Sequence, residues 1–286
     1  MPSLEVGGVR LFYTERGSGP AVVFVHGIPT DHRAWTSQAE ALSGEHRTIS
    51  YSRRYAAPND RKGDLRDSTI ENNVTDLAGM LGKLGVASAH VVGHSYGGFI
   101  AAYLAAHHPD LVRSLTLVEP AVSTMLVKDP NSAASLLGLL LRSPSVALSG
   151  RRFLKKGVEQ ALKAFEAGDA AEAARLNLDA VEDREGVLQG MAEPVRTMMT
   201  ENARTIAEVN APVPRFTRED ASRIRSPTLI VGGEQSPPWL QRIGETLASV
   251  IPGSRRVSIR RAAHFPHLEN SKEFNSTVSE FLRAHR

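Results

Sequence analysis

The first 120 residues alternate between apolar runs of strand length and longer stretches with helical periodicity. Strands are predicted at residues 21–25, 47–52, 89–92 and 114–118, and the continuous apolar run at 21–25 is typical of a buried parallel strand. Three amphipathic or Ala-rich stretches predict helices at residues 32–42, 70–84 and 99–106. Two shorter segments, residues 4–6 and 9–13, are joined by Gly7-Gly8 and predict an opening β-hairpin.

The alternation stops after residue 120 and returns near residue 215. The intervening block has helical patterns at residues 136–141, 153–167, 170–181 and 195–209, without a strand-like run. Strands are then predicted at residues 228–231 and 256–259, with helices at 239–250 and 271–284. This order predicts a doubly wound, mostly parallel α/β sheet built from residues 1–120 and 215–286, with residues 121–214 inserted as a helical lid.

Polar residues that could perform chemistry follow several of the predicted strands. They are His26, Ser95, Glu119, Glu234 and His264. Open parallel sheets bind ligands at the carboxyl ends of their strands. We therefore expect these side chains to converge on one site.

Ser95 lies in the sequence Gly-His-Ser-Tyr-Gly at residues 93–97, between a predicted strand and a predicted helix. In that context Gly-x-Ser-x-Gly predicts a nucleophile elbow, a strained turn that lifts the serine hydroxyl above the sheet. The alternative is a Gly-rich turn with a bystander serine. The strand before the motif and the helix after it favour a nucleophile.

A serine nucleophile needs a base, and the base needs a third group to orient it. The chain order in this kind of fold is serine, acid, histidine. His264 follows the last predicted strand and precedes the last helix, which places its imidazole over the sheet. His267 competes for this role, and a plain surface-loop histidine is the alternative interpretation of His264.

A reacting carbonyl also needs two N–H donors for its oxyanion. The backbone amide of Tyr96 is one candidate, because it begins a helix whose dipole favours negative charge. The loop after strand 21–25 supplies the other, and Ile28 is the candidate there because Pro29 has no amide hydrogen. A plain tight turn is the alternative interpretation of this loop.

Three segments together resemble the α/β-hydrolase superfamily: His-Gly-Ile-Pro at residues 26–29, Gly-His-Ser-Tyr-Gly-Gly at 93–98 and His-Phe-Pro-His-Leu-Glu at 264–269. They are most similar to its lidded esterases, lactonases and epoxide-hydrolase-like members. The resemblance implies an eight-stranded sheet with helices on both faces, a helical lid that shapes the pocket, and neither a cofactor nor a metal. It also implies that Ser95 is acylated and that His264 activates the water that hydrolyses the acyl-enzyme.

Members of the superfamily usually carry the triad aspartate in a Gly-Glu-x-Asp type segment after the strand that matches residues 228–231. This chain has Gly-Glu-Gln-Ser at residues 233–236, so Ser236 stands at that position. A serine cannot stabilise an imidazolium as a carboxylate does. Some members place the acid after the strand that follows the elbow helix, which implies Glu119, and the Arg53-Arg54 segment resembles that branch. Glu234 is the alternative acid, and a weak or absent acid is the third interpretation.

Composition changes this picture little. The chain has 286 residues, and its contents of 41% hydrophobic and 23% charged residues are ordinary for a soluble globular protein. Its net charge of +3 and pI near 9.3 are mildly basic. The absence of cysteine excludes disulfides and thiol chemistry. The densest basic cluster, Arg151, Arg152, Lys155 and Lys156, predicts a solvated helix face, with an anion site as the alternative. With no signal-like or membrane-spanning run, we expect a cytoplasmic monomer or homodimer without nucleic-acid or membrane partners.

The sequence therefore predicts a cofactor-free carboxylic-ester hydrolase that acts on an ester or lactone. The apolar lid favours a medium-sized, largely hydrophobic substrate. Ser95 argues against epoxide hydrolysis and dehalogenation, which use an aspartate nucleophile in the superfamily it resembles. A carbon–carbon bond hydrolase with the same serine and a non-catalytic, receptor-like ligand-binding homologue are the alternatives.

Overall fold

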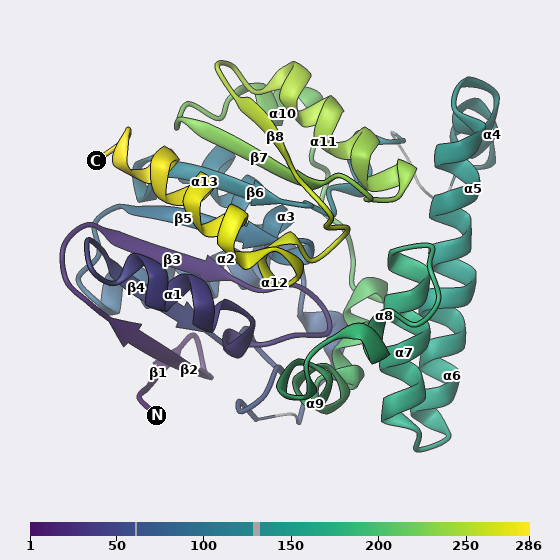
Figure 1. The fold of residues 1–286 in the computed structure, drawn as a ribbon, viewed down its shortest axis with the longest axis horizontal. Helices are drawn as coiled ribbons and strands as arrows, with labels where there is room; N and C mark the ends of the chain where they lie inside the picture. The colour runs from purple at the N-terminus through teal and green to yellow at the C-terminus, as the bar shows by residue number, and fades with distance from the viewer. Residues whose placement is uncertain (61, 128–131) are drawn as a thin grey trace.

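One sheet of eight strands runs through the described part of the molecule (Figure 1). The computed structural model describes residues 1–60, 62–127 and 132–286. In sheet order the strands are β1 (Ser3–Val6), β2 (Val9–Arg16), β4 (Arg47–Tyr51), β3 (Ala21–Val25), β5 (Ala89–His94), β6 (Val112–Val118), β7 (Thr228–Gly233) and β8 (Arg255–Ile259). Each strand expected from the sequence is present, and the α/β fold class is confirmed.

The sheet is antiparallel at one end and parallel over the rest of its width. β2 pairs antiparallel with both β1 and β4, whereas β4, β3, β5, β6, β7 and β8 run parallel to one another. All five residues of β3 are buried, as expected for a central parallel strand covered on both faces. Because the six parallel strands end at one edge, the loops that follow them meet there.

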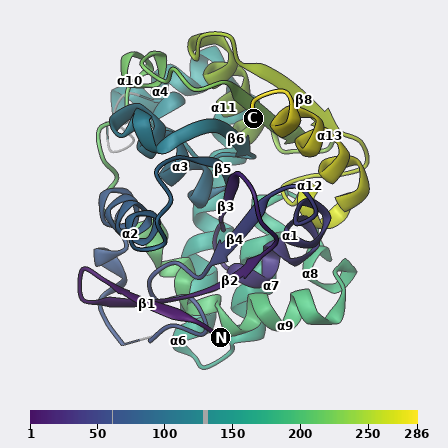
Figure 2. The same ribbon diagram turned by 90° about the vertical axis from the view of Figure 1, so that its left-hand side faces the viewer.

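Helices cover both faces of the sheet (Figures 1 and 2). On one face, α1 (Thr36–Leu42) packs against α13 (Ser271–Arg283). The other face carries α2 (Ile70–Lys83), α3 (Tyr96–His107), α10 (Arg218–Ser222) and α11 (Pro238–Val250), each packed against the next. α3 is apolar on nearly all sides and is buried nearly throughout, since it lies between the sheet and its neighbouring helices.

Between β6 and β7 the described residues form only helices and turns. After a short 3₁₀-helix (Ser123–Met125), they are α4 (Ala133–Arg142), α5 (Pro144–Arg152), a π-helix (Phe153–Glu159), α6 (Gln160–Glu166), α7 (Ala170–Val181), α8 (Val187–Gly190), α9 (Glu193–Glu201) and a 3₁₀-helix (Ala203–Asn210), and α10 follows before β7. We call residues 133–210 the helical block; it lies beyond the edge at which the parallel strands end (Figure 1). The division of the chain at residues 120 and 214 stays a prediction, and residues 128–131 of the predicted lid lie outside the described residues.

No helix in the described ranges is both long and apolar enough to cross a membrane.

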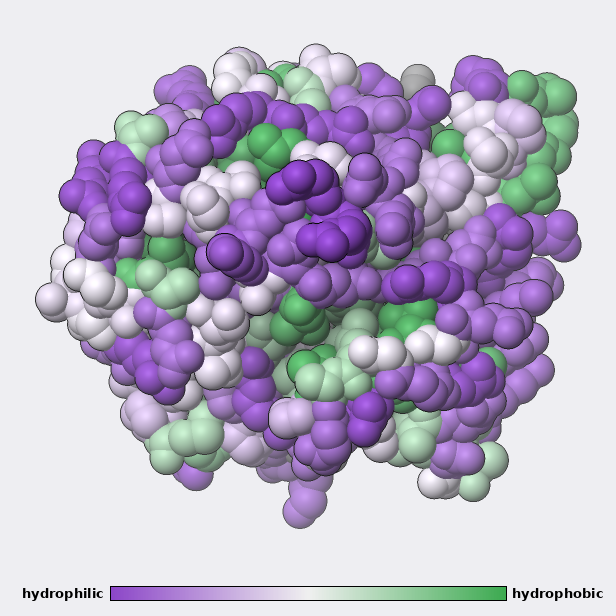
Figure 3. Space-filling view, viewed as in Figure 1, coloured by the Kyte–Doolittle hydropathy of each residue, from purple (hydrophilic) through white to green (hydrophobic). Residues whose placement is uncertain are grey.

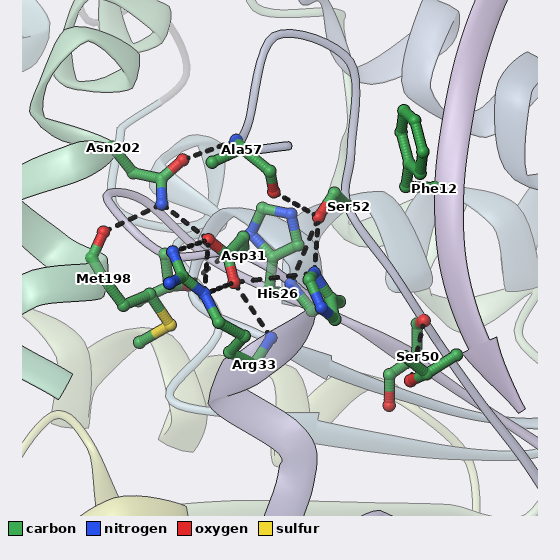
Figure 4. A network of polar contacts seen from close by, with 12 residues as sticks. Phe12, His26, Asp31, Arg33, Ser50, Ser52, Ala57, Met198 and Asn202 are labelled. Atoms are coloured by element: carbon green, nitrogen blue, oxygen red, sulfur yellow. Dashed lines mark hydrogen bonds and ion pairs between the residues drawn. The ribbon is translucent and has the colours of Figure 1, made fainter. Parts of the chain in front are cut away.

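A buried polar network around Asp31 joins the helical block to the loops that follow the strands (Figure 4). The Asp31 carboxylate accepts hydrogen bonds from Asn202 Nδ2 at 2.8 Å and from Arg33 Nη2 at 2.6 Å. The amide oxygen of Asn202 accepts a further one from the backbone of Ala57 at 2.8 Å. Because Asn202 lies between α9 and the last 3₁₀-helix of the block, these contacts fix the block over the carboxyl ends of β3 and β4.

Candidate active site

Ser95 occupies a strained turn between β5 and α3, as the motif predicts. Its φ is 52° and its ψ is −117°, a backbone conformation that side-chain-bearing residues rarely adopt. The flanking glycines make the turn possible. A Cβ atom on Gly97 would lie 2.3 Å from the carbonyl oxygen of Val25, and one on Gly93 would lie 2.3 Å from the carbonyl oxygen of Gly97. The elbow therefore brings α3, β5 and the end of β3 into backbone contact.

The hydroxyl of Ser95 faces the imidazole of His264, with 3.1 Å between Oγ and Nε2. His264 lies in the loop between β8 and the short α12 (Pro266–Glu269). Only 8% of Ser95 and 1% of His264 are exposed. Burial lowers the pKa of His264 to about 3, so the ring is neutral in this state and can accept the serine proton at Nε2.

Glu119 lies on the other side of His264, at the end of β6. Its Oε2 is 3.6 Å from His264 Nδ1, and neither atom has a hydrogen-bond partner among the described residues. Its φ of 45° is a second strained backbone position at this edge of the sheet. Burial raises the pKa of Glu119 to about 7, although hydrogen bonds from Ser236 and Gly233 act in the opposite direction.

Ser236, which stands where the resemblance leads one to expect an aspartate, contacts Glu119 directly. Its hydroxyl donates to Glu119 Oε1 at 2.7 Å, and the amide of Gly233 donates to the same oxygen at 2.8 Å. These two donors leave Oε2 to face His264. The sequence did not reveal this role of Ser236, because the serine was interpreted only as replacing the expected aspartate.

Glu234, the alternative acid, is turned to the surface. It is exposed, and its Oε2 accepts a hydrogen bond from the backbone amide of Arg261 at 3.0 Å. The structure thus brings Glu119, rather than Glu234, to His264.

His267, the competing histidine, is packed away from the serine. It is fully buried, and its ring stacks on Trp35 with 4.4 Å between ring centroids. His94, beside Ser95, contacts the His264 backbone instead: its Nε2–H donates to the carbonyl of His264 at 2.8 Å. Neither ring is placed to take a proton from Ser95.

The two proposed oxyanion donors belong to chain segments that adjoin Ser95. Tyr96 begins α3, where the first amides have no partner within the helix. The loop carrying Ile28 touches the elbow, because a Cβ on Gly27 would lie 2.9 Å from Ser95 Cβ. The amide of Ile28 donates no hydrogen bond within the described residues. Their role as an oxyanion hole stays a prediction.

Arg53, from the Arg-rich segment, connects this loop to the helical block. Its Nε donates to the carbonyl of His26 at 3.0 Å, and its guanidinium lies 5.0 Å from the centre of the Tyr96 ring. Its Nη1 forms a fully buried ion pair with Glu208 at 2.8 Å. Arg53 therefore contacts both chain segments that carry a candidate oxyanion donor.

Two further carboxylates surround the loop that carries His264, and sequence reasoning missed both. Glu269 Oε2 accepts hydrogen bonds from the amides of Ala263 at 2.7 Å and Phe265 at 3.3 Å. Arg184 Nη2 bridges Glu269, at 3.3 Å, and Glu182 of the helical block, at 2.5 Å. The loop is thus held from within α12 and from the end of α7. The contact between Arg184 and Glu269 gave no signal in the sequence, since it arises only when the block folds over the sheet.

The described residues contain no cluster of three or more His, Cys, Asp or Glu side chains arranged to hold a metal ion. At this edge of the sheet the buried Ser95 hydroxyl, the His264 imidazole and the Glu119 carboxylate lie in series.

Comparison with known proteins supports this picture of the fold. A family model described as alpha/beta hydrolase fold matches residues 20–271. RutD of Azorhizobium caulinodans, whose proposed activity is carbamate hydrolysis, is 28% identical over 287 residues, covering 98% of each chain. The 3-oxoadipate enol-lactonase 1 of Acinetobacter baylyi is 23% identical over 267 residues, covering 93% of this chain and 90% of that protein.

Among solved structures, the epoxide hydrolase VrEH1 from Vigna radiata superposes with a TM-score of 0.73 at 16% identity, covering 99% of this chain and 97% of that one. This likeness shows the fold alone. These three similar proteins are named for three different reactions, so the reaction of this chain has to be argued from its own site.

Proposed function

Because the chain belongs to the α/β-hydrolase fold family, we propose that it is a serine hydrolase that cleaves a carboxylic ester or lactone. The observation that carries this proposal is the 3.1 Å contact between Ser95 Oγ and His264 Nε2 at a strained elbow. Glu119 is the acid that orients His264, because its free Oε2 faces Nδ1 of that ring.

The first half of the reaction acylates the serine. Ser95 Oγ attacks the substrate carbonyl carbon while its proton passes to His264 Nε2. The oxyanion that forms is stabilised by the amides of Ile28 and Tyr96. The imidazolium then gives its proton to the leaving alkoxide oxygen as the carbon–oxygen bond breaks, which leaves an acyl group on Ser95. In a lactone the leaving alkoxide stays attached to that acyl group.

The second half returns the enzyme to its starting state. His264 takes a proton from a water molecule, which attacks the acyl carbonyl, and then returns the proton to Ser95 Oγ as the acid product leaves. His264 is positively charged during each half-reaction. Glu119 stabilises that charge from 3.6 Å, a distance that can shorten in the transition state as catalytic hydrogen bonds often do.

The serine nucleophile supports acyl chemistry over the epoxide chemistry of the structural relative. Two of the sequence relatives are named for reactions at carboxyl-type carbonyls, a carbamate and an enol-lactone. Attack by Ser95 on such a carbonyl gives an acyl-enzyme that water can hydrolyse, and the amides of Ile28 and Tyr96 are the proposed hydrogen-bond donors to its oxyanion.

A fluorophosphonate probe tests the nucleophile directly. We expect one covalent adduct on the native protein, located on Ser95 by peptide mass spectrometry. Ser95→Ala should abolish the adduct, whereas Ser222→Ala, a substitution at an exposed serine in α10, should leave labelling unchanged. Absence of labelling, or labelling that persists in Ser95→Ala, would contradict the proposal. A panel of nitrophenyl esters and lactones then ranks the substrates.

A further inference from the structure

The start of the helical block has a composition unlike the rest of the chain. Residues 132–158 carry five of the 34 Lys and Arg residues and none of the 31 Asp and Glu residues. Outside this segment acidic residues outnumber basic ones by two, so the net charge of +3 arises entirely here. The same 27 residues contain seven leucines. A cationic, leucine-rich segment without acids is typical of helices that lie on anionic lipid.

Six of these leucines are exposed on the folded protein. They are Leu136 (47%), Leu137 (56%), Leu140 (41%), Leu141 (77%), Leu148 (50%) and Leu154 (52%). Leu136, Leu137, Leu140 and Leu141 lie at helical spacing along α4. α4 packs against α5, and these four side chains form an exposed stripe on α4. Figure 3 shows the apolar patch on the protruding end of the block, at the upper right. Apolar side chains gathered in this way mark a binding surface, whereas single exposed leucines are ordinary.

Cationic side chains lie next to this patch. An open groove of about 550 Å³ beside α5 and the π-helix is lined by Leu148 together with Arg151, Arg152, Lys155 and Lys156. Arg152 pairs with Asp183. Arg151, Lys155 and Lys156 form no ion pair within the described residues, and all four cationic side chains are exposed. We call the six leucines and these four cations the α4–α5 surface.

We infer that the α4–α5 surface binds an anionic lipid bilayer, with the leucines in the interfacial region and the cations on the lipid phosphates. A second copy of this chain would bring two identical cationic clusters together, which disfavours a symmetric dimer through this face. Nucleic acid would contact the cations but leave the leucine stripe in water. A bilayer with anionic headgroups would bury the leucines and pair with the cationic side chains at the same time. The inference is independent of the reaction catalysed at Ser95.

Binding of the full chain to vesicles tests the inference. We expect co-sedimentation with vesicles of phosphatidylcholine mixed with phosphatidylglycerol, weakened by added salt, and little with phosphatidylcholine alone. Lys155→Gln with Lys156→Gln should weaken binding about thirtyfold, because each near-surface cation strengthens it about fivefold. Leu137→Ser with Leu141→Ser should also weaken it. Lys83→Gln with Lys272→Gln, two exposed lysines elsewhere, and Val213→Ser, an exposed apolar residue elsewhere, are the matched controls.

Each outcome decides the inference. Loss of binding in both surface variants, with binding kept in both controls, supports it. No binding of the native chain to the mixed vesicles overturns it, as does equal binding by all variants. The native chain could instead form a dimer in sedimentation equilibrium that Leu137→Ser with Leu141→Ser dissociates, while no vesicle binding is seen. That result would assign the surface to a second copy of the chain and would also overturn the inference. Unchanged melting temperatures confirm that the variants are folded.

Discussion

Glu119 and Ser236 share the place that one aspartate usually fills in the proteins this chain resembles. The carboxylate comes from the end of β6, and the hydroxyl after β7 donates to it at 2.7 Å. A glutamate has one methylene more than an aspartate, which suits its origin one strand away. The two residues together leave a single carboxylate oxygen for His264.

Glu119→Gln is expected to lower kcat on a nitrophenyl ester by about 10³- to 10⁴-fold, because an uncharged amide cannot stabilise the imidazolium. Glu234→Gln should stay close to the native rate, since that carboxylate caps Arg261 at the surface. Steady-state kinetics on both variants is the measurement. Equal losses, or the reverse ranking, would show that Glu119 is not the acid.

Ser236→Asp in the Glu119→Gln background gives a sharper control. The Ser236 hydroxyl and the Glu119 carboxylate occupy neighbouring positions, so an aspartate at residue 236 would place its charge beside the site that Glu119 has vacated. Partial recovery of kcat would show that the missing function is a carboxylate near His264. If Glu119→Gln lowered kcat only by destabilising the fold, Ser236→Asp would not restore it.

At the scale of elements, the loop from residue 260 to residue 265 decides the position of the base. α12 holds it through Glu269, which accepts hydrogen bonds from the amides on either side of His264. The helical block reaches the same loop through Glu182 and Arg184. The backbone on both sides of His264 is thus held in place, and the His264 ring faces Glu119.

Glu269→Ala should lower kcat by up to about a hundredfold with little change in KM, because a displacement of the base on the order of 1 Å has that cost. Glu269→Gln keeps an oxygen that can accept hydrogen bonds from both amides, and this variant should retain most of the native kcat. Glu280→Ala, at an exposed glutamate of α13, is the control. If Glu269→Gln is as slow as Glu269→Ala, a charge effect rather than positioning is responsible.

Elements with strong local signals could be predicted from the sequence, whereas elements shaped by distant contacts could not. The strand runs and the elbow were predicted because period and turn chemistry are local. The helix expected at residues 195–209 is instead α9 followed by a 3₁₀-helix, with Asn202 between them. Asn202 bonds to Asp31 and Ala57, partners that its own segment does not reveal. The same holds for Ser236, whose partner Glu119 lies far away in the sequence.

Across the whole molecule, the helical block and the sheet core are joined by charged and polar groups that are buried at their boundary. Arg53 and Glu208 form one such pair, and Asp31 with Asn202 forms another contact. Buried pairs of this kind favour a single arrangement of the block on the sheet core. Any other arrangement would separate the partners and leave a charge or polar group buried without a hydrogen-bond partner. The block is therefore held in one orientation over Ser95.

Glu182 makes this boundary sensitive to pH. Burial, and then the charge of Glu269, raise the pKa of Glu182 to about 7 against the opposing effect of Arg184. An acid whose pKa is higher in the folded than in the unfolded state binds its proton more tightly when folded. Its contribution to stability is therefore present below pH 4.5, the ordinary value, and is lost as the pH rises through about 7.

Glu182→Gln should remove this dependence, so that the variant gains stability relative to the native chain between pH 5 and pH 8. The gain is on the order of 3 kcal/mol, since one pKa unit corresponds to about 1.4 kcal/mol. Urea unfolding at the two pH values measures it, with Glu185→Gln, an exposed glutamate just beyond α7, as the control. A difference between native chain and variant that stays constant with pH would mean that Glu182 keeps its charge at the boundary, held by Arg184.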